Sequence, residues 1–167
     1  MTVTLYESPM SSATPVVHAL IELDIPWERA TVNLQKNEQK KPEFLKLNPN
    51  GKVPTLVIDG TPMFEALAIM MHLGDRYGVE RKLWPAADDP ARLEAMSWST
   101  WAYVSYGPAI YRLLQAENER VPKELHSAAQ AKRAREDLAQ LLGILNDRLA
   151  GRDYLLGKQF SLADLIV

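Results

Sequence analysis

The sequence predicts an α/β domain followed by a domain made only of helices. Two β-rich segments, Val3–Tyr6 and Trp27–Val32, flank a helical pattern, and this order indicates a βαβ unit. Thr55–Ile58 and Pro62–Phe64 flank the turn Asp59-Gly60, which is a strong hairpin pattern. In the C-terminal half, every apolar pattern has helical spacing.

The elements of the first domain follow in order from local signals. Thr14 supplies a capping hydroxyl and Pro15 suits the first helical position, so a helix begins there and breaks at Asp24-Ile25-Pro26. The strands that flank this helix should be parallel, because a crossover of this length returns in the same direction. Pro42–Leu47 predicts a short helix, and Ala66–Tyr77 predicts a mostly apolar one.

The predicted domain bounds are 1–78 for the α/β domain, 79–88 for a linker and 89–167 for the helical domain. In the helical domain, one segment runs from Asp89-Pro90 to about Glu119 and another begins at Pro122.

The last element, Phe160–Leu165, carries a capping box made by Ser161 and Asp164, together with a hydrophobic staple. The chain stops soon afterwards, at Val167, and so short a helix is marginal without tertiary support. We therefore expect the helical domain to be incomplete in this chain.

Composition is that of an ordinary globular protein, with 47% hydrophobic and 24% charged residues and a formal net charge of -2. Basic and acidic residues are interleaved, which argues against a nucleic-acid partner. The absence of a membrane-length apolar run and of an N-terminal leader predicts a cytoplasmic protein with no membrane partner. There is no cysteine, and the histidines His18, His72 and His126 are far apart, so we expect no metal site and no protein-thiol chemistry.

The most informative segment is Asn48–Ile58, in which Val53-Pro54 precedes a strand after a glycine-containing loop. A proline in this context is a candidate for a cis peptide bond. Such a bond would turn the backbone so that the N–H and C=O of Val53 pair with an extended peptide. The start of the next helix, at Glu65-Ala66, would lie beside it and favour a carboxylate. The pattern therefore predicts a site for a small acidic peptide.

Four motifs together resemble the glutathione S-transferase superfamily over essentially the whole chain: Asn48–Leu56, Phe64–Ile69, Ser161–Leu165 and Ser8–Thr14. The last of these looks like the active-site loop of the serine-type classes, particularly phi-like and related bacterial members. The resemblance implies a thioredoxin-like N-terminal domain that binds glutathione and a helical C-terminal domain that supplies much of the second substrate's pocket. It also implies a homodimer.

The resemblance assigns Ser11 as the hydroxyl that donates a hydrogen bond to the glutathione sulfur. A hydroxyl donor and a nearby helix N-terminus both favour thiolate over thiol, and the thiolate is the nucleophile. The alternatives are Ser12, because the loop register is open, and then Tyr6, which lies where tyrosine-type relatives keep their hydroxyl. A loop hydroxyl without catalytic function is the competing interpretation of Ser11.

For glutathione binding, the resemblance implies that Val53 pairs with the cysteinyl unit and that Pro54 holds this geometry. Glu65 would face the γ-glutamyl amino group. The next position usually carries Ser in the family, but this chain has Ala66. The Ala66 N–H can still hold the carboxylate, while one side-chain hydrogen bond of about 1 kcal/mol is lost.

The glycyl carboxylate would be met by Gln39, Lys40 and Lys41, and Lys52 lies where it reaches the same group. A solvated basic loop is the alternative interpretation of the first three.

The electrophile pocket would be lined by Met10, Trp101, Tyr103 and Tyr106. An aromatic stripe at helical spacing is more often core or dimer contact. An apolar pocket suits a hydrophobic electrophile.

These residues predict a glutathione transferase that conjugates the glutathione thiolate to a small hydrophobic electrophile, with glutathione as co-substrate and no metal. Transfer of alkyl or aryl groups in this way is a detoxification reaction. The alternative is a non-catalytic binding or interaction protein with the same fold, which is favoured by Ala66 and by the short C-terminus. A thiol-disulfide reductase that uses protein thiols is excluded, because there is no cysteine.

Overall fold

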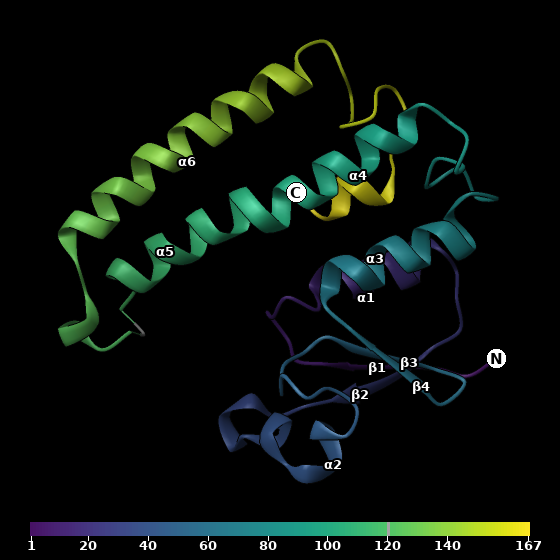
Figure 1. Cartoon of the computed structure of the whole chain (residues 1–167), viewed down its shortest axis with the longest axis horizontal. Helices are drawn as coiled ribbons and strands as arrows, with labels where there is room; N and C mark the ends of the chain where they lie inside the picture. Colours follow the sequence, from purple (N-terminus) through teal and green to yellow (C-terminus); the bar gives the residue numbers. More distant parts are fainter. Residues whose placement is uncertain (120) are drawn as a thin grey trace. The chain divides into compact units, whose positions relative to one another are not determined.

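A computed structural model of the chain describes residues 1–119 and 121–167. The described residues form two compact units, Met1–Arg92 and Leu93–Val167 (Figure 1). Segment 79–88 lies inside the first unit. Within this described part of the chain, none of the helices combines the length and the apolar character that crossing a membrane requires.

The first unit is built on a mixed four-stranded sheet in the order β2-β1-β3-β4. The strands are β1 (Val3–Glu7), β2 (Glu28–Thr31), β3 (Thr55–Ile58) and β4 (Thr61–Phe64). β1 is parallel to β2 and antiparallel to β3, and β3 is antiparallel to β4. The predicted βαβ unit and hairpin are therefore confirmed.

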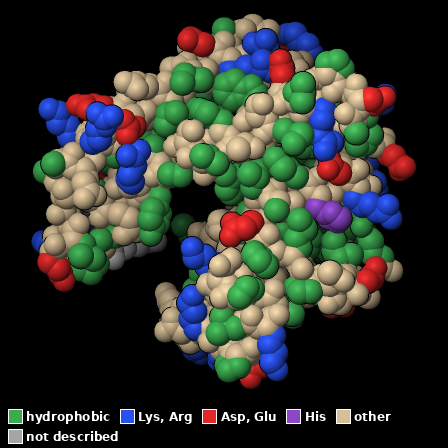
Figure 2. Space-filling view, in the orientation of Figure 1, with side chains coloured by type: hydrophobic (Ala, Val, Ile, Leu, Met, Phe, Trp, Pro, Cys, Tyr) green, Lys and Arg blue, Asp and Glu red, His purple; other side chains and the backbone are tan. Residues whose placement is uncertain are grey.

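Helices cover both faces of this sheet. In Figure 1, α1 (Thr14–Glu22) and α3 (Ala66–Leu73) lie on one face and α2 (Pro42–Leu45) lies on the other. Side chains alternate along β1, so that Tyr6 reaches the α2 face and meets Phe44 edge-on, with ring centroids 5.8 Å apart. Two 3₁₀ turns precede α2, and Figure 2 shows basic side chains (Lys and Arg, blue) in this region.

The start of α1 differs from the sequence prediction. The capping position is Ala13, and Thr14 is the first helical residue, so the predicted Thr14 cap is wrong. The Thr14 hydroxyl instead donates to the Ser11 carbonyl at 2.9 Å. The side chain of Ser11 accepts the Ala13 N–H at 3.2 Å and thus satisfies a backbone donor at the helix start.

The segment after α3 is held firmly on the first unit. α3 continues into a π-helical turn that begins at Gly74, and a Cβ there would lie 2.7 Å from Trp84 Cγ, so the ring packs directly on the backbone. The Trp84 indole N–H donates to Asp75 at 2.8 Å, and Arg92 pairs with the same carboxylate at 2.6 Å. These contacts fix segment 79–88.

The second unit is helical, as predicted. Its elements are α4 (Ala91–Trp101), a π-helical turn (Ala102–Tyr106), α5 (Gly107–Glu117), a 3₁₀ turn (Lys123–Leu125), α6 (Ala128–Leu149) and a final 3₁₀ turn (Leu162–Leu165). The predicted helix start at Pro122 is wrong, because the Ser127 hydroxyl supplies the cap by accepting the Gln130 N–H at 3.3 Å.

Ion pairs show that α5 and α6 are antiparallel. Arg112 pairs with Asp137 at 2.8 Å, and Glu117, further along α5, pairs with Arg135, earlier on α6. On α6, Ala131 and Ala134 are buried in this arrangement.

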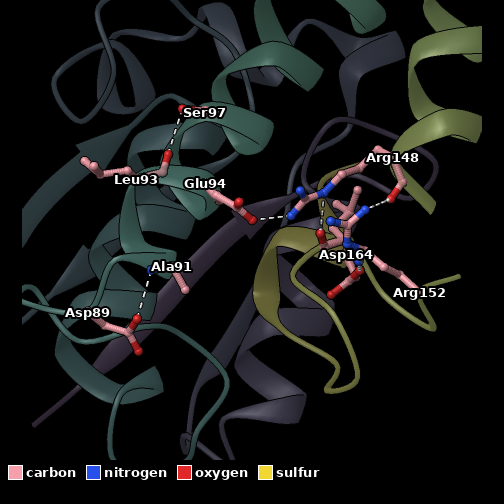
Figure 3. A network of polar contacts seen from close by, with 9 residues as sticks. Asp89, Ala91, Leu93, Glu94, Ser97, Arg148, Arg152 and Asp164 are labelled. Atoms are coloured by element: carbon pink, nitrogen blue, oxygen red, sulfur yellow. Dashed lines mark hydrogen bonds and ion pairs between the residues drawn. The ribbon is translucent and has the colours of Figure 1, made fainter. Parts of the chain in front are cut away.

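Arg148 at the end of α6 ties the second unit together (Figure 3). Its guanidinium pairs with Glu94 of α4 and donates to the Leu155 carbonyl at 2.7 Å. The Leu155 N–H in turn donates to Asp164 at 2.7 Å. Asp164 also accepts the Ser161 N–H at 2.8 Å, so the predicted capping box forms.

The loop that leads into β3 is shaped by one buried amide. Asn48 is 2% exposed, and its Nδ2 donates to Lys52 O at 2.8 Å and Thr55 Oγ1 at 3.0 Å. Its Oδ1 accepts the Asn50 N–H at 3.0 Å. The Val53-Pro54 peptide bond that follows is cis, as predicted.

Asn48→Ala should lower the free energy of unfolding by about 2–3 kcal/mol, because it removes all three hydrogen bonds of a buried amide side chain. Urea unfolding followed by circular dichroism measures this change. Asn146→Ala, at an exposed position of α6, is the matched control and should change stability by less than about 0.5 kcal/mol. Equal stability of the two variants would contradict the role given to Asn48.

Candidate functional site

The register of the sheet brings three separate segments to one end of the first unit. Tyr6 at the end of β1 pairs with Thr55 at the start of β3. Thr55 in turn pairs with Phe64 at the end of β4. The loop after β1, the loop before β3 and the first residues of α3 therefore meet at this end.

The two adjacent serines of the first loop have different partners. Ser11 Oγ donates to the Ser8 carbonyl at 2.6 Å, within its own loop. Ser12 Oγ donates to the carbonyl of Val53 at 3.0 Å, in the second loop. Ser11 can serve a ligand by rotating away from Ser8, since its partner belongs to the same short turn.

Val53 presents its backbone at this end of the sheet. Its side chain is buried in an apolar cluster with Val32 and Phe44. In the described part of the chain its N–H donates to no protein group, whereas its carbonyl already accepts Ser12. The open group on this edge is therefore the N–H, and a ligand must share the carbonyl with Ser12.

The start of α3 is open to an anion. Glu65 occupies the capping position with φ 69° and ψ 112°, a conformation uncommon for a residue other than glycine. No side chain caps this helix among the described residues. The first backbone hydrogen bond of the helix is donated by the Ile69 N–H to the Glu65 carbonyl, so the N–H groups before Ile69 have no partner within the helix. The N–H groups that begin with Ala66 are thus free, and such groups bind carboxylates.

Gln39 and Lys40 lie against the loop before β3. Lys40 Nζ donates to the Asn50 carbonyl at 3.1 Å. The Lys40 side chain packs against Gly51, because a Cβ atom at residue 51 would lie 2.8 Å from Nζ. The φ of Gly51 is 57°. The Gln39 Oε1 atom is buried and has no hydrogen-bond partner among the described residues. Both residues thus lie beside Gly51, which directly precedes the exposed Lys52.

Lys41 points elsewhere. It pairs with Glu38 at 3.6 Å, and the Asn33 N–H donates to that carboxylate at 2.8 Å. The hydrogen bond from the Asn33 N–H is the largest cause that lowers the pKa of Glu38 below its ordinary value, and the positive charge of Lys41 acts in the same direction. Lys41 and Tyr6 line a cavity of about 300 Å³ on the α2 face. Neither the loop after β1 that carries Ser11 and Ser12 (the serine loop, residues 8–13) nor the start of α3 contributes to this cavity.

The predicted electrophile residues lie in both units. Met10 belongs to the first unit and is 92% exposed, with φ 56°. In the second unit, Trp101 stacks on Tyr106 with ring centroids 5.5 Å apart, and Tyr103 lies in the same π-helical turn. A role for these side chains in substrate binding stays a prediction.

Two features of the site escape sequence reasoning. The bond from Ser12 to Val53 joins residues 41 apart, and no local pattern announces it. The left-handed conformation of Glu65 is likewise unmarked, because glycine or asparagine would be the usual residue there. The structural role of Asn48 has a weak signal, namely an amide residue ahead of a proline-glycine loop.

Comparison with known proteins agrees with this geometry. The family model for the glutathione S-transferase N-terminal domain matches residues 1–75, and that for the C-terminal domain matches residues 96–167. Glutathione S-transferase 1 of Schizosaccharomyces pombe is 38% identical over 153 residues, which are 90% of this chain. Glutathione S-transferase hmp2 of Hypomyces subiculosus is 33% identical, and the match covers 99% of this chain and 79% of hmp2.

A solved glutathione transferase from Burkholderia graminis, with two glutathione molecules bound per subunit, is 33% identical with a TM-score of 0.87. The match covers 99% of this chain and 70% of that protein. The chain spans 66% of the length of the fission-yeast relative. Matches to both family models, together with relatives above 30% identity over most of their length, place this chain in the glutathione S-transferase family.

Proposed function

We propose that the protein binds glutathione at the end of the sheet and conjugates its thiolate to a small hydrophobic electrophile. The observation that carries the proposal is the meeting of the Val53 N–H, the uncapped start of α3 and the Ser11 hydroxyl. In the reaction, the sulfur forms a bond to an electrophilic carbon and the leaving group departs with its electron pair. The thiol proton goes to solvent.

Glutathione offers a group for each of these elements. The Val53 N–H would donate to the cysteinyl unit, in the manner of an added strand. The Ala66 N–H and the dipole of α3 would hold the γ-glutamyl carboxylate, and Glu65 would pair with the adjacent amino group. Lys40 and Lys52, with Gln39, would meet the glycyl carboxylate.

Ser11 would stabilise the thiolate. A hydroxyl that donates to sulfur favours the charged form, and the start of α1 adds a favourable field. Ser11 need not remove the proton, since lowering the thiol pKa suffices to populate the nucleophile near neutral pH.

Several further expectations rest on family likeness: a homodimer, a cytoplasmic location, a detoxification role and an electrophile pocket with the aromatic residues of the second unit. A non-catalytic protein of the same fold is the second candidate, because Ala66 lacks the hydroxyl usual in the family. Turnover by the wild-type protein with glutathione and an aryl halide separates the two candidates.

Ser11→Ala should lower kcat for an aryl halide about 100-fold, because the thiolate loses its hydroxyl donor. Glutathione affinity, measured by calorimetry, should stay within about two-fold of the wild-type value, since the backbone contacts remain. The pKa read from the pH profile of kcat should rise. Unchanged turnover would remove Ser11 from the mechanism.

Ala66→Ser should strengthen glutathione binding about five-fold, because it adds one hydrogen bond of about 1 kcal/mol to the carboxylate. Calorimetric titration measures the dissociation constant. Ala139→Ser, on the exposed surface of α6, is the control and should leave it unchanged. Weaker or equal binding by Ala66→Ser would mean that the carboxylate does not lie at the start of α3.

A further inference from the structure

The hydroxyl of Ser12 bridges the two loops that form the candidate site. Ser12 Oγ lies 3.0 Å from the Val53 carbonyl oxygen, across 41 residues of sequence. In the described part of the chain, no other hydrogen bond joins the loop after β1 to the loop before β3, apart from those of the β1–β3 ladder. Beyond the β1–β3 pairing, this contact therefore helps to set the spacing between the serine loop and the Val53 backbone.

The hydrogen bonds also distinguish Ser12 from its neighbour. A serine hydroxyl has one proton, and that of Ser12 is directed to Val53. Donating to a ligand sulfur would break the link between the loops. Ser11 has its partner, Ser8, within the same turn, so its proton can be redirected without separating the loops.

We propose that Ser12 is a positioning residue: its hydroxyl holds the Val53 carbonyl so that the Val53 N–H faces glutathione at a fixed distance from Ser11. This inference rests on the proposed function for the identity of the ligand. It assigns the two serines separate tasks, with Ser11 at the sulfur and Ser12 at the peptide edge. It also explains why the carbonyl is engaged while the N–H of the same residue is open.

Steady-state kinetics of the whole protein test this assignment. Ser12→Ala should raise the KM for glutathione about five-fold, the effect of one lost hydrogen bond, while kcat falls by less than about two-fold. Ser12→Thr keeps the hydroxyl and should restore the KM. Thr14→Ala removes a hydroxyl that bonds within the serine loop only, and should leave the KM unchanged.

A measurement without ligand separates this proposal from the proposed function. The ¹³C chemical shift of the Val53 carbonyl reports on hydrogen bonding to its oxygen. It should move in Ser12→Ala and return in Ser12→Thr, whether or not glutathione binds.

Three results would overturn the inference. One is a fall in kcat at unchanged KM in Ser12→Ala, which would make Ser12 the thiol donor. Another is an equal KM change in Thr14→Ala, which would indicate general loosening of the loop. The third is a Val53 carbonyl shift that is insensitive to Ser12→Ala. Absence of turnover and of glutathione binding in the wild-type protein would instead refute the proposed function and, with it, the ligand named here.

Discussion

The register of the mixed sheet is the constraint on which the candidate site depends. Thr55, the first residue of β3, pairs with both Tyr6 and Phe64. The Val53-Pro54 segment that directly precedes β3 is therefore flanked by the serine loop and by the start of α3. A slip of one residue would turn every side chain of β3 to the other face and move Val53 away from both neighbours. The Val53 N–H, the start of α3 and the Ser11 hydroxyl thus owe their proximity to strand pairing.

Two side chains, those of Asn48 and Ser12, further fix the conformation of the loop before β3. Asn48 shapes the loop from within, and its buried amide is satisfied by backbone groups and by Thr55. Ser12 holds the outer side of the same loop by contacting Val53. A buried polar group that is fully bonded favours one conformation of its surroundings, because every alternative leaves a partner unsatisfied.

Much of the fold is predictable from sequence because it follows from local rules. Alternation in β1, the Asp59-Gly60 turn and the helical spacing after residue 89 each indicate their element correctly. The two helix starts predicted at Thr14 and Pro122 are misplaced because serines nearby in the chain bond the first backbone N–H groups: Ser11 accepts the Ala13 N–H, and Ser127 accepts the Gln130 N–H. Contacts between distant segments, such as Ser12 with Val53, lie beyond any local pattern.

The basic segment before α2 illustrates the same limit. Lys40 and Lys41 are adjacent in sequence, yet one contacts Asn50 beside the candidate site and the other pairs with Glu38 at a separate cavity. Short 3₁₀ turns send neighbouring side chains in different directions, so their grouping in the sequence does not imply a shared ligand.

The central claim is that glutathione lies along the Val53 edge with its γ-glutamyl carboxylate at the start of α3. A titration of the ¹⁵N-labelled protein with glutathione, followed through its backbone amide resonances, tests this most directly. The account predicts that the amides of Val53 and Ala66 shift together with that of Ser11, while those of Lys41 and Phe44 stay in place. Shifts confined to the Tyr6–Phe44 cavity, or none at all, would contradict it.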